Sequence, residues 1–418
     1  MTGTLGRALL LENIHPSAVE VLRGAGFEVE QRPGSLAPDD LADALQGVTL
    51  LGIRSNTTVT AEVIAKAGDL AAIGCFCIGT NQVDLAAATD TAVPVFNAPY
   101  SNSRSVVELV IGEIIALSRR LTVKNQAMHN GVWDKSAGGS YEVRGRTLGI
   151  VGYGNIGTQL ANVAEALGMR VVFFDIADRP IHGNARRMSS LDQLLETADV
   201  VSLHVDGRPG NAGMFGDQQL AKMKPGAIFI NASRGMVVDD SALRDHLLAG
   251  HLGGAALDVF PVEPKAQGDS FESVLRGLEN VILTPHIAAS TKEAQEEIGW
   301  FVAGKLLNYV RSGDTSLSVN FPRVQLPAQT SAQRLSYLHH NVPGVLAELN
   351  SVVSAVGLNI EAQALSTTGQ LGYVLTDFDS RPSEELIQRI AALPHTITAR
   401  LIGEVGNEAG ARSRSGRS

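Results

Sequence analysis

Cysteine is scarce in this chain: only Cys75 and Cys77 occur among 418 residues. Two thiols with one residue between them suit neither a disulfide scaffold nor a four-ligand metal site. We therefore expect both cysteines to be buried and unreactive, and we expect no bound metal.

Long apolar runs are missing as well, since no stretch of about 20 apolar residues occurs that could span a membrane. Residues 1–11 hold one basic residue and an apolar run too short for a signal peptide.

Acidic residues outnumber basic ones by 43 to 34, which gives a net charge of −9. Nucleic acids and anionic membranes bind clustered lysine and arginine, so neither is expected as a partner. We predict a cytoplasmic protein that acts on small molecules.

The most informative stretch is residues 148–157, an apolar run that ends in a G-x-G-x-x-G pattern at Gly152, Gly154 and Gly157. The pattern predicts a strand, a tight turn and a helix start, where a pyrophosphate binds the positive end of the helix. A second apolar strand, 171–174, ends at Asp175, close to the spacing of about 20 residues at which an acid binds ribose hydroxyls. This context favours NAD, and a glycine-rich turn in another kind of α/β protein is the alternative.

Short strands alternate with helices on both sides of this motif, which predicts parallel sheets covered by helices. We predict two doubly wound, Rossmann-like α/β domains with a cleft between them. The first, a substrate-binding domain, covers residues 1–98 and 285–315 and is discontinuous. The second, an NAD-binding domain, covers 99–284 and begins with one long helix, 105–121.

The C-terminal part follows a connector of low periodicity. Residues 331–404 show a β-α-β-β-α-β pattern, which is typical of a ferredoxin-like fold. The last residues, 405–418, are rich in glycine, serine and arginine, and we expect them to be disordered.

Three predicted strands of the second domain are each followed by a residue that the oxidation of a 2-hydroxy acid needs: Arg234, Glu263 and His286. An arginine binds a carboxylate through its planar fork and can polarise the C2 oxygen. A histidine exchanges a proton near neutral pH, and a glutamate on its other nitrogen fixes the tautomer. A single histidine is weak evidence, because His204 also ends a strand, so the prediction depends on all three residues together.

In the first domain, ligands are expected beyond the carboxyl ends of the strands. Two loops lie there. One follows the strand 48–53, and the other could bind a carboxylate through its backbone N–H groups. The candidate residues are Arg54, Ser55, Cys77, Ile78 and Gly79.

On these motifs, and on segments 74–81 and 97–105, the chain resembles the D-isomer-specific 2-hydroxyacid dehydrogenases from about residue 8 to 404. The resemblance implies that Arg234 binds substrate, Glu263 orients His286, and His286 carries the proton. It assigns substrate contacts to Arg54 and Ser55. The implied dinucleotide site consists of Gly152, Gly154, Asn155, Ile156, Gly157, Asp175, Ala232, Ser233, Arg234, Asp258, His286, Ala288 and Ala289. Two departures from bacterial members are Asn56, where a second arginine is usual, and the pair at 288–289, which usually contains glycine.

The C-terminal module resembles an ACT domain, an amino-acid-sensing module found in part of this family. That combination implies NAD-dependent oxidation of 3-phospho-D-glycerate to 3-phosphohydroxypyruvate, the first committed step of L-serine biosynthesis, with a possible side reduction of 2-oxoglutarate. It also implies a homotetramer that serine inhibits by binding between paired modules at His339, Asn341 and Asn359. His340 and Val342 depart from the relatives' residues.

Several alternatives remain open at this point. The module could serve dimerisation only. The enzyme could be a glyoxylate or D-lactate dehydrogenase, although such relatives are not expected to carry the module. A formate dehydrogenase is disfavoured, since glutamine stands there in place of Glu263. A non-catalytic corepressor that senses NAD could share the fold.

Overall fold

The computed structural model describes residues 5–264, 268–327 and 333–402. The chain divides into two compact units. Unit 1 is Met1–Ser101 with Gln295–Ser418, and unit 2 is Asn102–Ala294. The predicted disordered tail, 405–418, lies outside the described residues. The predicted substrate-binding and ACT ranges fall mainly in unit 1 and the predicted NAD-binding range in unit 2, and the exact domain limits stay a prediction.

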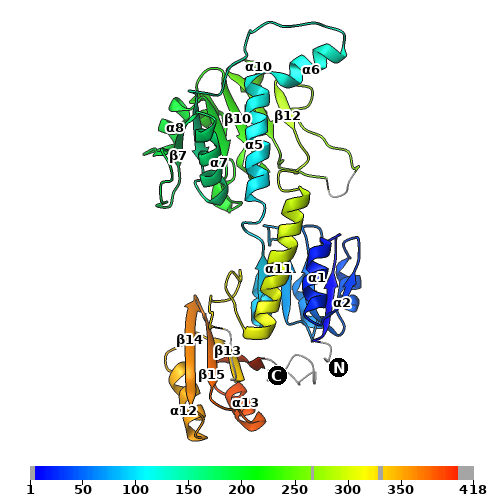
Figure 1. Ribbon diagram of the computed structural model, residues 1–418, viewed down its shortest axis with the longest axis vertical. Coiled ribbons are helices and arrows are strands. Elements are labelled where there is room, and N and C mark those ends of the chain that lie inside the picture. Colours follow the sequence, from blue (N-terminus) through cyan, green and yellow to red (C-terminus); the bar gives the residue numbers. More distant parts are fainter. Residues whose placement is uncertain (1–4, 265–267, 328–332, 403–418) are drawn as a thin grey trace. The chain divides into compact units, whose positions relative to one another are not determined.

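Unit 1 contains a five-stranded parallel sheet in the order β2-β1-β3-β4-β5. Its strands are β1 (Arg7–Leu10), β2 (Glu28–Gln31), β3 (Val48–Ile53), β4 (Ala72–Cys75) and β5 (Val95–Asn97). Helices α1 (Pro16–Gly24) and α11 (Lys292–Ser312) share one apolar cluster with the sheet, and Figure 1 shows them side by side. Another cluster joins α2 (Pro38–Ala44), α3 (Ala61–Lys66) and α4 (Leu85–Asp90) to the sheet. Buried apolar strands with helices on both faces confirm the doubly wound prediction.

The C-terminal part of unit 1 is a four-stranded antiparallel sheet in the order β14-β15-β13-β16. Its elements are β13 (Gln333–His340), α12 (Val345–Ala355), β14 (Ile360–Thr368), β15 (Leu371–Phe378), α13 (Glu384–Ala391) and β16 (Thr396–Ile402). Both helices pack against the sheet through one apolar cluster that includes Tyr337, Leu349, Val374 and Ile390. The ferredoxin-like prediction is confirmed, and β14 and β16 are the edge strands.

Unit 2 contains a seven-stranded parallel sheet in the order β12-β11-β10-β9-β6-β7-β8. Its strands are β6 (Thr147–Val151), β7 (Arg170–Phe174), β8 (Arg186–Arg187), β9 (Val200–Leu203), β10 (Ala227–Asn231), β11 (Leu252–Leu257) and β12 (Val281–Leu283). Helices α5 (Ser103–Ser118) and α7 (Asn155–Ala166) share one apolar cluster with the sheet (Figure 1). A separate cluster holds α8 (Leu191–Thr197), α9 (Asp217–Ala221) and α10 (Asp240–Leu248). The strand order reverses between β6 and β9, where such sheets bind ligands.

The helix predicted at 105–121 is wrong in extent. Helix α5 ends at Ser118, and α6 (Leu121–His129) starts after Arg120, whose φ of 52° lies in the left-handed region. The segment around α6 exposes several large apolar side chains: Leu121, Met128, Val132, Trp133 and Tyr141. Trp133 is 76% exposed. Isolated apolar side chains are normal on a surface, whereas this segment exposes five of them within about 20 residues.

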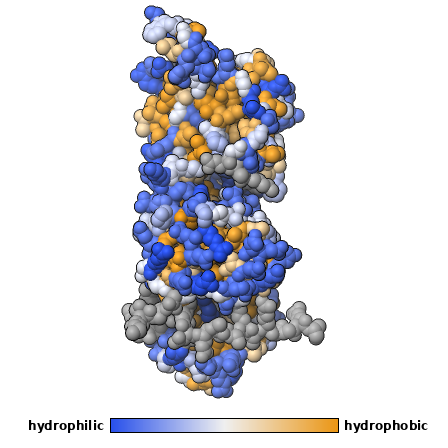
Figure 2. Space-filling view, turned by 90° about the vertical axis from the view of Figure 1, so that its right-hand side faces the viewer, coloured by the Kyte–Doolittle hydropathy of each residue, from blue (hydrophilic) through white to orange (hydrophobic). Residues whose placement is uncertain are grey.

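In the part of the chain that the structure describes, no helix is long and apolar enough to cross a membrane. Figure 2 shows one face of the molecule, on which hydrophilic residues are interspersed with smaller hydrophobic groups.

A buried ion pair joins the C-terminal sheet to the end of α11 within unit 1. The Arg334 side chain is 1% exposed and donates to both carboxylate oxygens of Asp377, from Nε at 2.6 Å and from Nη2 at 2.8 Å. Its guanidinium also donates to the backbone oxygens of Ser312 and Pro327, at 3.1 and 2.8 Å. These hydrogen bonds offset the desolvation cost of the buried charge, so the pair fixes β13 and β15 to the helix end.

We predict that Arg334→Met lowers the free energy of unfolding by about 3 to 5 kcal/mol, because Asp377 is left as a buried charge without its partner. Guanidinium denaturation followed by circular dichroism measures this change. The double variant Arg334→Met/Asp377→Leu should recover most of the loss, since it leaves no unpaired charge. A single variant as stable as wild type would show that this ion pair does not stabilise the contact.

Candidate active site

The loop between β6 and α7 is shaped for close approach of a dinucleotide. Gly152 has φ of +94°, and a Cβ there would lie 2.5 Å from the backbone oxygen of His204. A Cβ on Gly157 would clash with the backbone oxygen of Gly152, whereas Gly154 faces open space. Asn155 and Ile156 open α7, so their N–H groups lie at its positive end. The residues therefore fit a bound pyrophosphate.

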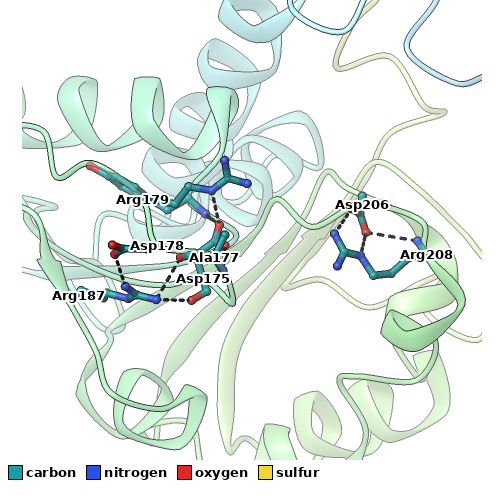
Figure 3. Close-up of polar contacts among 8 residues, drawn as sticks. Asp175, Ala177, Asp178, Arg179, Arg187, Asp206 and Arg208 are labelled. Atoms are coloured by element: carbon teal, nitrogen blue, oxygen red, sulfur yellow. Dashed lines mark hydrogen bonds and ion pairs between the residues drawn. The ribbon is translucent and has the colours of Figure 1, made fainter. Parts of the chain in front are cut away.

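Asp175 follows β7 and lies beside this loop (Figure 3). Its carboxylate accepts hydrogen bonds from the backbone N–H of Tyr153 and of Ala177, both at 2.8 Å. The Nε of Arg179 lies 3.5 Å from the same carboxylate. A largely buried acid at this point fits ribose hydroxyls.

Two more arginines of unit 2 form ion pairs near Asp175. Arg187 donates to the carboxylate of Asp178 and to the backbone oxygens of Asp175 and Ala177. Arg208 forms an ion pair with Asp206 just beyond β9 (Figure 3). Sequence reasoning missed this second pair, because its two residues stand in a loop without a motif.

His286 and Glu263 form the predicted pair. The Nδ1 of His286 donates to Oε2 of Glu263 at 2.8 Å, and Oε1 of Glu263 accepts the N–H of Phe260 at 3.1 Å. The hydrogen bond to Glu263 raises the pKa of His286 above its ordinary value, against the opposing effect of burial. Burial tends to raise the pKa of Glu263, but the hydrogen bonds from His286 and Phe260 keep it below its usual value. The glutamate is thus an anion that stabilises the protonated imidazole.

Arg234 lies close enough for its charge to act on both members of this pair, lowering the pKa of His286 and of Glu263. Its Nη1 donates to the backbone oxygen of Ser233 at 2.6 Å. Asn231, at the end of β10, accepts from both the N–H and the hydroxyl of Ser233, and donates to the backbone oxygen of Arg234. Unit 2 therefore brings the three predicted catalytic residues together, and the turn 231–234 that carries Ala232 is held by side-chain hydrogen bonds.

Asp258 is 1% exposed and anchors the segment that carries His286. Its carboxylate accepts from the hydroxyl of Thr284 at 2.6 Å and from the N–H groups of Ile287 and Ala288 at 2.8 Å. The resemblance assigned it only to the dinucleotide. Ala288 is buried as part of this anchor.

Sequence reasoning missed Glu113, a buried carboxyl group on α5. Burial, with a contribution from the charge of Asp258, raises the pKa of Glu113 to about 8, so it is protonated at neutral pH. The available signal was its spacing: of the two glutamates in α5, only Glu113 shares a helical face with the buried residues Val106, Val110 and Leu117. The alternative candidate His204 directly follows β9, and its Nε2 bonds the hydroxyl of Ser202 at 2.9 Å. Burial lowers its pKa to about 4, so it stays neutral.

The two predicted substrate loops lie in unit 1, at the carboxyl ends of β3 and β4. Arg54 and Ser55 directly follow β3, and the backbone oxygen of Ile78 accepts from Asn97 at 2.6 Å. The Sγ of Cys77 donates to the backbone oxygen of Gly79 at 3.2 Å. Burial raises the pKa of Cys77 to about 11, so this thiol is protonated at neutral pH.

The three residues assigned to an effector do not meet within one chain. Asn341 lies by the β14–β15 turn, where its N–H donates to the backbone oxygen of Gln370 at 2.7 Å and its side chain to that of Gly369 at 3.2 Å. Asn359 precedes β14 at the opposite end of that strand. His339 is buried, and its Nε2 has no hydrogen-bond partner among the described residues.

In the described ranges, no group of three or more histidine, cysteine or acidic residues could hold a metal ion.

Comparisons with known proteins agree with this geometry. The profile of the D-isomer specific 2-hydroxyacid dehydrogenase NAD binding domain matches residues 111–288, and that of the AHAS small subunit-like ACT domain matches 335–398. The chain is 50% identical to the D-3-phosphoglycerate dehydrogenase of Escherichia coli K12, over 94% of this chain and 97% of that one. It is 46% identical to the enzyme of that name from Dictyostelium discoideum, over 95% of this chain and 97% of that one.

Solved structures show the same architecture. A D-lactate dehydrogenase from Aquifex aeolicus, complexed with NAD and lactic acid, is 26% identical with a TM-score of 0.63, covering 72% of this chain and 95% of that one. The TT0316 protein of Thermus thermophilus is 33% identical with a TM-score of 0.65, covering 72% of this chain and 96% of that one.

The predictions of two Rossmann-like domains, an ACT domain and an NAD-dependent dehydrogenase are thereby confirmed. On its sequence, fold and active-site geometry, the chain belongs to the D-3-phosphoglycerate dehydrogenases of the D-isomer-specific 2-hydroxyacid dehydrogenase family.

Proposed function

We propose that this enzyme oxidises 3-phospho-D-glycerate to 3-phosphohydroxypyruvate with NAD, in the biosynthesis of L-serine. The observation that carries the proposal is the 2.8 Å contact between His286 and Glu263 beside Arg234. The names of relatives that are nearly 50% identical over almost the whole chain support the substrate.

Each catalytic residue has one role in this proposal. Arg234 binds the substrate carboxylate and polarises the C2 oxygen through its N–H groups. His286 accepts the C2 hydroxyl proton at Nε2, while its Nδ1–H stays on Glu263 and the carboxylate stabilises the imidazolium. Bound NAD supplies the acceptor for the hydride from C2. Residues 152–157 hold the pyrophosphate, and Asp175 binds the adenosine ribose. Arg54 and Ser55 contact the substrate.

The substrate assignment is tested by NADH formation at saturating NAD. We expect kcat/KM for 3-phospho-D-glycerate to exceed that for D-lactate and D-glycerate by at least about tenfold. Equal values would favour a D-lactate or glyoxylate type, and no NADH from any of these acids would favour a corepressor. The side reduction of 2-oxoglutarate and the location in the cytoplasm stay predictions.

We predict a preference for NAD over NADP of about 2 to 4 kcal/mol in kcat/KM, because the Asp175 carboxylate repels a 2′-phosphate. Asp175→Asn removes the charge at nearly constant size and should reduce the preference. Asp178→Asn is the matched control, since this exposed acid forms its ion pair with Arg187 and lies outside the bonds to Tyr153 and Ala177. Comparable kcat/KM values for the two cofactors in wild type would refute the prediction.

We predict that His286→Asn slows oxidation by a factor on the order of 10² to 10⁴, with NAD affinity nearly unchanged. Glu263→Gln removes the anion that raises the pKa of His286. Oxidation requires neutral His286, so activity increases with pH through its pKa. The acid limb of the kcat profile should therefore move to lower pH in Glu263→Gln. An unmoved limb would show that the pairing does not control the base.

We further propose that serine inhibits the enzyme and binds where two ACT modules pair. Asn341 and Asn359 lie at opposite ends of β14, which is nine residues long, or roughly 30 Å. Because β14 is an edge strand, a second copy paired antiparallel along it would bring Asn341 of one copy to Asn359 of the other. A shallow depression open to solvent lies beside α12 and is lined in part by Asn350, Ser354 and Asn359.

A homotetramer needs two different contact surfaces on each chain. The edge strand β14 is one. The exposed apolar side chains around α6, from Leu121 to Tyr141, are the other. Light scattering during size-exclusion chromatography measures the oligomeric state.

We predict that serine inhibits the full chain and that Asn341→Ala and Asn359→Ala each raise the half-inhibitory serine concentration by at least about tenfold, the typical size of an allosteric coupling. Ser336→Ala is the control. It removes a hydrogen bond to Arg400 in the same sheet without touching either asparagine. If millimolar serine does not inhibit the wild-type enzyme, the proposed regulation is wrong and the module serves dimerisation only.

A further inference from the structure

A buried carboxylate holds the loop that carries Arg54. Glu12 follows β1, is 7% exposed and has φ of +60°. Its carboxylate accepts the backbone N–H of Arg54 at 3.1 Å, of Asn56 at 2.9 Å and of Thr57 at 2.9 Å. These donors, all within residues 54–57, converge on one side chain that is distant in sequence, so the backbone of 54–57 has one arrangement in which all the bonds form.

A buried amide connects this loop to the second one. Gln82 is also 7% exposed, and its Nε2 donates to the backbone oxygen of Arg54 at 2.6 Å and of Gly79 at 3.2 Å. The same nitrogen lies 3.4 Å from the Sγ of Cys77. Arg54 is thus held on both sides, through its N–H by Glu12 and through its C=O by Gln82.

These hydrogen bonds lie beyond the strand pairing of the sheet. The loops 54–57 and 77–79 leave the ends of β3 and β4, where the strand pairing stops at Ile53 and Cys75. Beyond that point, side chains that bond the backbone of these loops include those of Glu12, Gln82 and Asn97. If the loop that carries Arg54 is already ordered, less conformational entropy is lost when substrate binds, and the affinity for substrate is higher.

We propose that Glu12 and Gln82 are positioning residues that fix the 54–57 and 77–79 loops for substrate, so that they set the affinity for the acid substrate and leave cofactor binding unchanged. The inference depends on the proposed substrate role of Arg54 and Ser55. Neither Glu12 nor Gln82 contacts the substrate itself. The side chain of Glu12 acts through the backbone of 54–57, and that of Gln82 acts through the backbone of both loops and the thiol of Cys77.

The test compares Glu12→Gln, Gln82→Met and Arg54→Ala with Asn320→Ala. The Glu12→Gln variant has one acceptor oxygen where several N–H groups converge, and the Gln82→Met variant keeps the side-chain length but cannot donate. Asn320 is the matched control in the same unit: it bonds Val95 N–H, Thr89 and the Val93 oxygen, and none of the loop residues. The measurements are kcat, KM for 3-phospho-D-glycerate, KM for NAD and the thermal midpoint of each full-length variant.

We expect Glu12→Gln and Gln82→Met to raise KM for 3-phospho-D-glycerate on the order of tenfold, the effect of one lost hydrogen bond to a charged or buried group, with KM for NAD within about twofold of wild type. Asn320→Ala should lower the midpoint without this split between the two KM values. If Glu12→Gln does not fold, Gln82→Met alone decides the outcome.

Two outcomes would overturn the inference, and they are distinguishable. If Arg54→Ala raises KM for the acid but Glu12→Gln and Gln82→Met do not, the positioning role is wrong and the substrate role of Arg54 remains. If Arg54→Ala leaves that KM unchanged, the proposed substrate role fails and the inference fails with it. Equal increases of both KM values in Glu12→Gln and Gln82→Met would indicate a general structural role instead.

Discussion

The catalytic geometry depends on one buried anion, the carboxylate of Asp258. It receives a hydroxyl hydrogen bond from Thr284 and two backbone N–H bonds from Ile287 and Ala288, and thereby ties the end of β11 to the segment after β12. His286 lies inside this segment with φ of +53°, a conformation that few non-glycine residues adopt without support. The same turn from β11 carries Glu263. Because Asp258 joins the segment after β11 to the segment after β12, His286 lies 2.8 Å from Glu263.

Carboxylates hold loops throughout the molecule. Asp258 holds the segment of the proposed base, Glu12 holds the loop of Arg54, and Asp175 accepts two backbone N–H groups while it lies beside the dinucleotide loop. A buried carboxylate is costly unless its oxygens are bonded, and converging N–H groups satisfy them. The same bonds hold the backbone of each loop in one arrangement.

Much of the fold and site followed from the sequence, because most strands are short apolar runs and the candidate catalytic residues stand in the loops that follow such runs. Arg234, Glu263 and His286 were placed at strand ends in this way, and the structure brings them together. Strand β2 was missed, because Glu28–Gln31 is an edge strand with a single apolar residue. The break after Ser118 was missed because the left-handed residue there is Arg120, and this conformation can be predicted from sequence mainly where the residue is glycine. Glu12 and Gln82 could not be predicted, since their roles depend on contacts between residues far apart in sequence.

The proposed mechanism requires that Glu263 raises the pKa of His286 and keeps the proton on Nδ1, so that Nε2 can accept the hydroxyl proton. The most direct measurement is a ¹⁵N NMR titration of the histidine side chains in the full chain, with His286 assigned by comparison with His286→Asn. We expect a pKa above about 6.5, the ordinary value for histidine, and a neutral form protonated on Nδ1. A pKa at or below the ordinary value, or a neutral form protonated on Nε2, would contradict the proposed mechanism.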